Sequence, residues 1–124
     1  MRPAPGGPMP LALAAARRAA EAGEVPVGAV VVDALGEVLA IAHNEVEARC
    51  DPTAHAEILA LREAGRRRGT PRLTDCDLWV TLEPCPMCAQ AIAFARIRRL
   101  YFAAADPKGG GVEHGARVFA AASC

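Results

Sequence analysis

Two short stretches of the sequence carry side chains that bind metal ions well, and neither stretch forms a complete site alone. The first, "DPTAHAEILALREAG", contains His55 and Glu57, and the second, "TLEPCPMCAQAI", contains Cys85 and Cys88. A Cys-x-x-Cys pair at a helix start places both sulfurs on one face, where free amides and the helix dipole favour the metal-binding thiolate. Pro86 costs no hydrogen bond in such a first turn. Together the two stretches supply one imidazole and two thiolates.

This donor set is typical of a catalytic zinc site. Three protein ligands leave the fourth position of a tetrahedral Zn²⁺ ion to water, whereas a structural site is closed by four protein ligands. Water bound to zinc loses a proton near neutral pH, and some group must accept that proton. Glu57, beside the metal rather than on it, is suitably placed for this proton transfer.

Each stretch alone has a plainer interpretation. A Cys-x-x-Cys pair can be a redox dithiol of the thioredoxin type. Taken alone, His55 is explained as a surface or capped residue, and Glu57 as a favourable charge in a first helical turn. Side chains at i and i+2 project to opposite sides of a helix. His55 and Glu57 can therefore reach the same point only if that point lies at the end of the helix. Because both stretches open helices at the ends of strands or loops, where open α/β sheets bind ligands, the combination favours a single zinc site.

Hydrophobic periodicity and turn residues predict the elements that position these side chains. Helices are expected over about 10–22, 52–68 and 86–96, and strands over 27–33, 37–43, 77–83 and 99–105. Loops are expected over 44–51 and 106–115, with a short helix in 116–123. The order helix, strand, strand, helix, strand, helix, strand predicts a three-layer α/β/α sandwich with a mixed sheet.

Length and composition limit the remaining classes. A chain of 124 residues suits one domain, placed at residues 10–124 after a Pro- and Gly-rich disordered leader over 1–9. The formal net charge is zero, so any contact with nucleic acid must come from local clusters. The sequence has no apolar run long enough to span a membrane, no signal-peptide cleavage region, and an odd count of five cysteines. We therefore expect a cytoplasmic protein without a disulfide framework or a membrane partner.

The combination of His-x-Glu with a later Pro-Cys-x-x-Cys matches the known signature of zinc-dependent nucleobase deaminases. The segments "EVPVGAVVV", "DPTAHAEILALREAG", "LWVTLEPCPMCAQAI" and "FARIRRLYFAAADPKGGGVEHG" closely resemble bacterial tRNA-specific adenosine deaminases, of the zinc-dependent cytidine/deoxycytidylate deaminase superfamily. The likeness extends from about residue 11 to residue 124. It implies a cytidine deaminase-like fold and hydrolytic deamination of adenosine to inosine at the first (wobble) anticodon position of tRNA. It also implies one Zn²⁺ ion per subunit, held by His55, Cys85 and Cys88, with Glu57 as the catalytic proton shuttle.

The same resemblance assigns a substrate pocket. Asn44 matches the family asparagine that hydrogen-bonds the base, although alone it would be explained as a turn residue. The backbone of Val27, Gly28 and Ala29 is expected to line the pocket. An amide both donates and accepts hydrogen bonds, which suits a purine edge, and anticodon loops offer unstacked bases.

Contact with the tRNA anticodon loop is expected from the glycine-rich segment 106–111. Asp106 is a candidate acceptor from ribose, and Lys108 supplies a positive charge, whereas an ordinary connecting loop explains the segment equally well without the resemblance. Arg96, Arg98 and Arg99 either hold phosphates or complement a helix dipole. The other expectations are a solvated face at Arg66–Arg68, core positions for Phe94 and Phe102, and no metal role for Cys50, Cys76 and Cys124.

The sequence departs from the family at its end. Family members continue with a further strand and a terminal basic helix, which are missing after Cys124, so we expect an uncovered sheet edge. The resemblance implies a homodimer with "PMCAQAIAFARIR" near its interface. Two alternatives stay open, namely a deaminase of a free base or nucleoside (guanine, cytosine or cytidine) and a non-catalytic truncated zinc domain. The zinc motif does not separate the first alternative from a tRNA enzyme, while its intact residues oppose the second.

Overall fold

Four strands form one mixed sheet in the computed structural model, which describes residues 7–120. The strand order is β2-β1-β3-β4. β1 (Gly28–Val32) pairs antiparallel with β2 (Val38–His43) and with β3 (Asp77–Leu82), and β3 pairs parallel with β4 (Arg99–Ala104). The predicted mixed sheet is confirmed.

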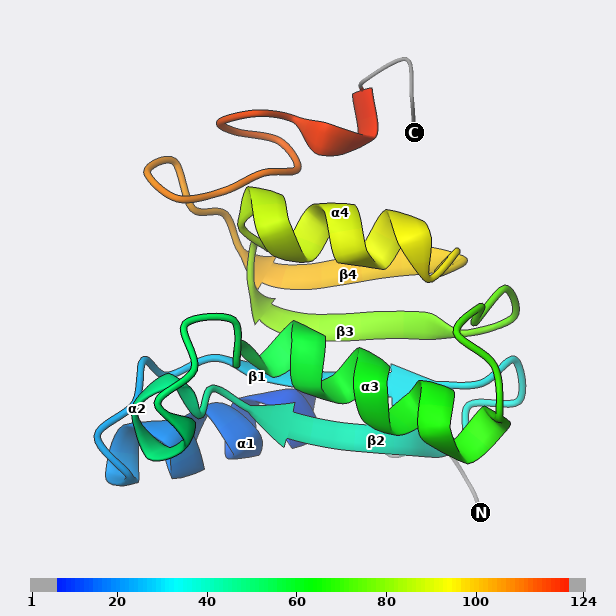
Figure 1. Ribbon diagram of the computed structural model, residues 1–124, viewed down its shortest axis with the longest axis horizontal. Helices are drawn as coiled ribbons and strands as arrows, with labels where there is room; N and C mark the ends of the chain where they lie inside the picture. The colour runs from blue at the N-terminus through cyan, green and yellow to red at the C-terminus, as the bar shows by residue number, and fades with distance from the viewer. Residues whose placement is uncertain (1–6, 121–124) are drawn as a thin grey trace.

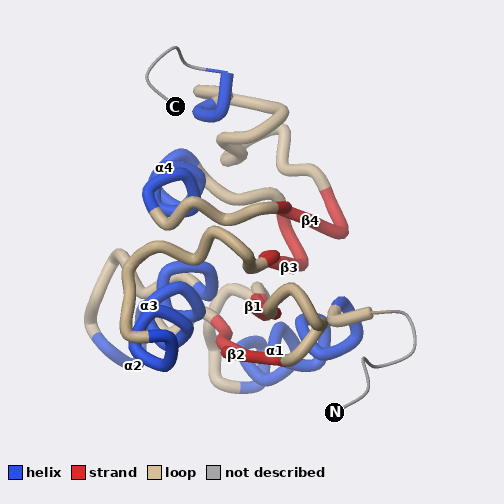
Figure 2. Tube along the Cα trace, turned by 90° about the vertical axis from the view of Figure 1, so that its right-hand side faces the viewer, coloured by secondary structure: helices blue, strands red, loops and turns tan. Residues whose placement is uncertain are grey.

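Helices cover both faces of this sheet. α1 (Met9–Glu21) lies on one face, and α3 (Ala56–Arg68) and α4 (Pro86–Phe94) lie side by side on the other (Figures 1 and 2). The larger core cluster lies between the sheet and α3 and α4, and a smaller one joins α1 to the opposite face. In α3 the buried positions Ala56, Ala60 and Ala64 recur every four residues, so one small-residue face packs closely on the sheet. The predicted three-layer α/β/α sandwich is confirmed.

A short helix interrupts the segment that was expected to be a polar loop. α2 (Val46–Arg49) lies within residues 44–51, and the backbone N–H groups of Glu47 and Ala48 donate to the Glu24 carboxylate at 3.0 and 2.9 Å. A single helical turn is not stable in isolation, so this distant carboxylate supplies the partners that the turn needs. The prediction of a loop is therefore wrong for the middle of this segment.

The helix that carries Glu57 begins later than expected. Both the backbone N–H and the hydroxyl of Thr53 donate to Asp51 Oδ1, at 2.8 and 2.7 Å, which holds the residues before the helix in a turn. His55 has extended backbone angles and is the N-cap, so the first helical residue is Ala56 rather than residue 52 or 53.

The helix ends lie close to their predicted positions. α3 ends at Arg68 as predicted, where Gly69 adopts a left-handed conformation with φ of 68°. α4 ends at Phe94, two residues before its predicted end, and Arg96 takes a φ of 61° on the way to β4.

The predicted C-terminal helix is one turn of 3-10 helix, η1 (Val118–Ala120). Residues 1–6 and 121–124 lie outside the described range, and with them most of the expected leader over 1–9 and Cys124. The described part of that leader ends at Met9, which already belongs to α1. Within residues 7–120, no helix is long and apolar enough to cross a bilayer.

Candidate metal centre and substrate pocket

The N-termini of α3 and α4 meet at the end of the sheet where β3 and β4 finish (Figure 1). His55 is the N-cap residue of α3, and Cys85 is the N-cap residue of α4. Neither side chain makes a capping hydrogen bond, so both remain available as ligands. Cys88 lies one turn into α4 and is fully buried. The structure thus brings together the three residues that the sequence singled out as metal ligands.

The spacing of the three donor atoms fits a tetrahedral zinc ion. His55 Nδ1 lies 3.6 Å from Cys85 Sγ and 3.4 Å from Cys88 Sγ, and the three ligand atoms lie within 4.8 Å of one another. Tetrahedral bonds of about 2.3 Å to sulfur and about 2.1 Å to nitrogen place such atoms about 3.6 Å apart. One imidazole and two thiolates at this spacing therefore suit Zn²⁺, with Nδ1 as the ring nitrogen that faces it and one position left open.

The two sulfurs are already prepared to bind a cation. Hydrogen bonding from the Cys88 thiol lowers the pKa of Cys85 to about 5, with smaller contributions from the Cys88 backbone N–H and His55, although burial opposes them. The interaction with Cys85, together with burial, raises the pKa of Cys88. The pair therefore holds one thiolate and one thiol at neutral pH, and it releases the remaining proton when a metal binds.

Glu57 is the titratable group placed beside this cluster. Its carboxyl is only 4% exposed, and burial, aided by the charge of Cys85, raises its pKa to about 7. It contributes no ligand to the His55, Cys85 and Cys88 group. A bound dication would lower the pKa of Glu57 again, because it stabilises the carboxylate. A buried carboxyl that titrates near neutrality can both accept and release a proton, which is the property of a general acid–base.

A pocket of about 580 Å³ opens beside the cluster and is lined by His55, Glu57 and Cys85. This volume is typical of small-molecule sites. Three of the predicted substrate residues, Asn44, Val27 and Asp106, line the same pocket. The structure therefore places a candidate base-reading amide and a candidate proton shuttle around one cavity.

Three other predicted substrate residues are not part of the pocket lining. Gly28 packs against α1, where an added Cβ would overlap the carbonyl oxygen of Ala12, and its N–H donates to Thr81 Oγ1 at 3.1 Å. Ala29 is fully buried in the core cluster between the sheet and α3. Lys108 is exposed and is not among the residues that line the pocket. Gly28 and Ala29 therefore lie behind the pocket wall, and their expected part in substrate binding stays a prediction.

Two buried carboxylates of the pocket wall were not anticipated from the sequence. Glu24 is 7% exposed and holds α2 in place, as described above. Glu83 is 2% exposed, and burial alone would raise its pKa. Hydrogen bonds from the Asp106 N–H, the His114 ring and the N–H groups of His114 and Val112 outweigh burial and lower the pKa of Glu83 to about 2. The only signal for Glu83 in the sequence is its place directly after a buried apolar strand, and Glu24 lies four residues before the first residue of β1.

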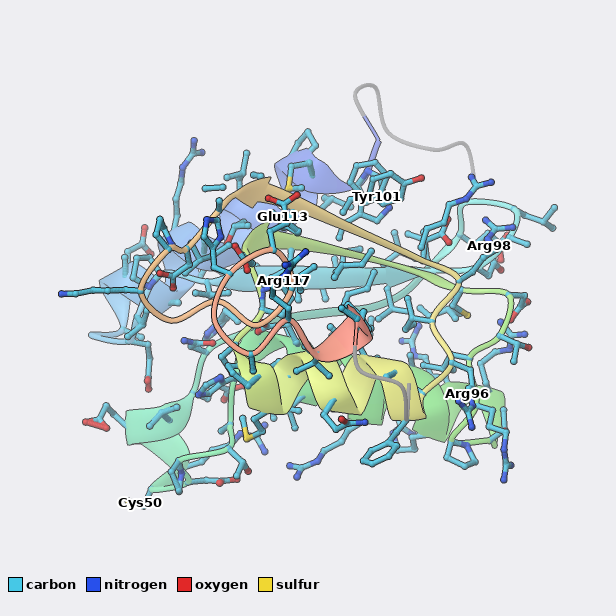
Figure 3. All side chains as sticks on the ribbon, turned by 90° about the horizontal axis from the view of Figure 1, so that it is seen from above. Cys50, Arg96, Arg98, Tyr101, Glu113 and Arg117 are labelled. Atoms are coloured by element: carbon cyan, nitrogen blue, oxygen red, sulfur yellow. The ribbon has the colours of Figure 1, made fainter. Side chains whose placement is uncertain are left out.

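The predicted phosphate-binding arginines lie away from the pocket. Figure 3 shows Arg96 and Arg98 at the end of the molecule opposite Cys50 and the loop that carries Glu113. Arg98 makes a bidentate pair with Asp77 at 3.0 and 2.9 Å. This pairing gives Arg98 a structural role that neither the phosphate interpretation nor the helix-dipole interpretation anticipated.

The surface expectations gave mixed results. Arg66 and Arg67 pair with Glu63, and Arg68 pairs with Asp75, as expected for a solvated face. Phe102 packs against the core as predicted, but the prediction for Phe94 is wrong, because its side chain is 72% exposed. Of the other cysteines, Cys76 is buried and Cys50 is exposed.

Comparison with known proteins agrees with this geometry. Residues 8–104 match the family model for the cytidine and deoxycytidylate deaminase zinc-binding region. A tRNA-specific adenosine deaminase of Agrobacterium fabrum is 55% identical over 116 residues, which cover 94% of this chain and 76% of that protein.

Solved structures show the same likeness. A structure from a study of A-to-I editing by tRNA:A34 deaminases at the wobble position of transfer RNA superposes with a TM-score of 0.91 at 55% identity, covering 94% of this chain and 83% of that chain. A guanine deaminase from Bacillus subtilis gives 0.75 at 41% identity, over 78% and 62% of the two chains. With two helix N-caps that converge on a zinc-type donor set and a family model that matches most of its length, this chain belongs to the cytidine and deoxycytidylate deaminase zinc-binding family.

Proposed function

We propose that this protein is a zinc-dependent hydrolase that converts adenosine to inosine at the wobble position of tRNA. The observation that carries the proposal is the placement of Glu57 beside a His55, Cys85 and Cys88 cluster with zinc-type spacing, inside one pocket. The likeness to proteins named tRNA-specific adenosine deaminase supplies the substrate class.

His55 Nδ1 and the sulfurs of Cys85 and Cys88 would hold one zinc ion per chain. When bound, zinc supplies the Lewis acidity that makes a water molecule nucleophilic at neutral pH. The Glu57 carboxylate accepts the proton of that water, which attacks C6 of adenine. Glu57 passes this proton to the ring nitrogen, then takes a second proton from the new hydroxyl on C6 and gives it to the amino group, which leaves as ammonia. Its near-neutral pKa in the metal-free protein reflects the burial that keeps these transfers away from bulk water.

Asn44 reads the base through one end of its amide. Its Oδ1 already accepts the backbone N–H of Ala56 at 2.7 Å, so the amide Nδ2 is the group left to donate to an acceptor on the purine. The target base must leave its stack to enter the pocket, and an anticodon loop offers such a base at small cost. A tRNA substrate also implies that the protein acts in the cytoplasm.

A mass-spectrometric deamination assay tests the proposal. Zinc-loaded protein is offered an anticodon stem-loop with adenosine in the first anticodon position, a matched stem-loop with uridine there, and free adenine, guanine, cytosine and cytidine. Inosine in the adenosine stem-loop alone is the expected result. A folded, zinc-bound protein that converts none of these substrates would contradict the proposal and leave a non-catalytic zinc domain.

A free-base deaminase is the second candidate, and the structural likeness to a guanine deaminase favours it. Both candidates need the same metal ligands and the same proton shuttle, so the site geometry does not distinguish them. Conversion of guanine or another free base, with no inosine in the stem-loop, would assign the protein to this class.

We also infer that the protein forms a homodimer through the exposed side of α3 and α4. A hollow of about 670 Å³ between these helices is lined by apolar side chains that include Ile58, Leu61 and Phe94. Phe94 is 72% exposed, and a large exposed aromatic next to an apolar hollow is typical of an association surface. The segment 86–98, expected near the interface of the family dimer, contributes Ala91, Phe94 and Ala95 to the lining of this hollow.

A further inference from the structure

The carboxylate of Glu83 gathers five hydrogen bonds from one loop. Its side chain has no exposed surface. Oε2 accepts the backbone N–H groups of Val112, Glu113 and His114 at 3.1, 3.0 and 3.0 Å. Oε1 accepts the N–H of Asp106 at 3.0 Å and contacts the His114 ring Nδ1 at 2.8 Å. Because a buried carboxylate is costly unless it is fully partnered, these donors and Glu83 hold one another in place.

The donors come from both ends of the loop between β4 and η1, and this loop packs tightly on Glu83. An added Cβ at Gly110 would overlap the Glu83 carboxylate, and one at Gly111 would lie 2.6 Å from the backbone nitrogen of Pro86. Gly111 also donates its N–H to the Pro84 carbonyl at 2.7 Å. Only residues without a side chain fit at these two positions, so the loop follows the surface of the turn that leads into α4.

Through Asp106, this attachment reaches the substrate pocket. Glu83 holds the Asp106 N–H, and Asp106 Oδ1 in turn accepts the N–H groups of Lys108 and Gly109 at 3.2 and 3.0 Å. Asp106 and Gly109 both line the pocket. Glu83 thus fixes Asp106, and Asp106 fixes a part of the pocket wall that is distant in sequence from Asn44 and Val27.

The metal-binding turn has its own supports. The backbone N–H of Glu83 donates to Ala104 at 2.8 Å, and the N–H of Ala89 donates to the carbonyl of Cys85 at 2.8 Å. Neither bond involves the Glu83 side chain or the loop. Loss of the carboxylate is therefore expected to free the loop and to leave the ligand cluster in place.

We propose that Glu83 is a positioning residue for substrate binding, which holds the loop over residues 106–114 so that Asp106 and Gly109 form the wall that receives the RNA. The identity of the bound molecule rests on the proposed function above, whereas the attachment of the loop does not. The Glu83 side chain has no exposed surface, so it would act on the substrate through the loop that it holds.

The test is Glu83→Gln. A glutamine side chain has one oxygen, which can accept either from the donors that contact Oε1 or from those that contact Oε2. Its NH₂ group then faces the other donors and cannot accept from them, so part of the loop is released. We expect hydrogen exchange of the amides over 106–114 to accelerate by about tenfold or more, and KM for the stem-loop to rise by about tenfold with kcat nearly unchanged. Zinc content stays at the wild-type value. Glu113→Gln makes the same chemical change at an exposed position of the same loop (Figure 3) and should alter none of these quantities.

Gly110→Ala is a second way to release the loop, because its methyl group displaces the loop while Glu83 is unchanged. If Glu83→Gln does not fold, this variant tests whether Glu83 holds the loop. Unchanged loop exchange in these variants would overturn the proposal. Loss of zinc, or a fall in kcat at constant KM, would show that Glu83 serves the metal turn and would equally overturn it. A wild-type protein inactive on the stem-loop would refute the proposed function, while the exchange and zinc measurements would still decide the role of Glu83.

Discussion

Asn44 Oδ1 accepts a hydrogen bond of 2.7 Å from the backbone N–H of Ala56, the first residue of α3. His55, the N-cap of that helix, makes no side-chain cap, so Asn44 satisfies the helix end in its place. The Asn44 N–H donates to the Val27 carbonyl at 3.2 Å, which fixes the residue between the pocket wall and the helix. One amide therefore stabilises the ligand-bearing helix through its oxygen, and under the proposed function its nitrogen is the group that would contact the substrate.

These two functions can be separated by substitution at Asn44. Asn44→Asp keeps an acceptor for the Ala56 N–H and removes the donor, whereas Asn44→Ala removes both. We expect Asn44→Ala to lose about 1 kcal/mol of unfolding free energy and Asn44→Asp to lose less, as for other helix N-terminal acceptors. Both variants should lose at least about tenfold in kcat/KM, since each leaves a substrate acceptor without its partner. Chemical denaturation and steady-state kinetics measure the two effects, and wild-type kcat/KM in Asn44→Asp would show that Nδ2 does not contact the base.

Glu57→Gln is expected to abolish turnover while the protein keeps its zinc. The substitution preserves the size of the side chain and removes the group that exchanges protons, so kcat should fall by about 100- to 10,000-fold. Glu63→Gln on the same helix is the matched control, because within residues 7–120 the ion pairs of Glu63 are those with Arg66 and Arg67 at the surface. Single-turnover assays and metal analysis report the result. If Glu57→Gln lost zinc, Glu57 would be a ligand, and the assignment of its role would be wrong.

The metal cluster could be predicted from the sequence because its residue types are few and specific. One histidine and a Cys-x-x-Cys pair, each at a helix start, allow only a small number of chemical interpretations. The strands could be predicted equally well, since buried runs such as Val30–Val32 in β1 are bounded by turn residues. The strands depend on local sequence, whereas the metal cluster required two separate stretches to be joined, and the known deaminase signature provided that link.

The features that were missed depend on contacts between distant residues. α2 exists because Glu24 accepts its N-terminal amides from 23 and 24 positions away, and nothing in "EVEAR" shows this. The sequence around Glu83 does not show that the loop over residues 106–114 covers its carboxylate. Apart from Gln90, every residue of α4 is apolar, so its sequence does not show that Cys88 and Ile92 face inward while Phe94 faces solvent. In each case the tertiary partner, not the pattern, determines the outcome.

Cys88→Ala is expected to lose zinc, because His55 and Cys85 alone provide two ligands. Cys76→Ala is the control, since both cysteines are fully buried and only Cys88 belongs to the ligand cluster. The control should retain zinc and lose about 1 kcal/mol of unfolding free energy, typical of a buried substitution. Metal analysis after gel filtration measures zinc per chain. Chelation of the wild-type protein should reproduce the inactivity of Cys88→Ala, and activity should return on addition of zinc. A fully active, metal-free Cys88→Ala variant would contradict the zinc site.

Phe94→Asp is expected to shift the protein from dimer to monomer. Phe94 exposes 72% of its surface beside the apolar hollow between α3 and α4, and a carboxylate there would be buried without a partner in a symmetric interface. Leu35→Asp makes a comparable change at a residue that is 81% exposed in the turn between β1 and β2 and does not line the hollow, and this variant should remain dimeric. Sedimentation equilibrium over a range of protein concentrations measures the association constant of each variant. An unchanged association constant in Phe94→Asp, or a wild-type protein that is monomeric throughout that range, would exclude this surface as the dimer interface.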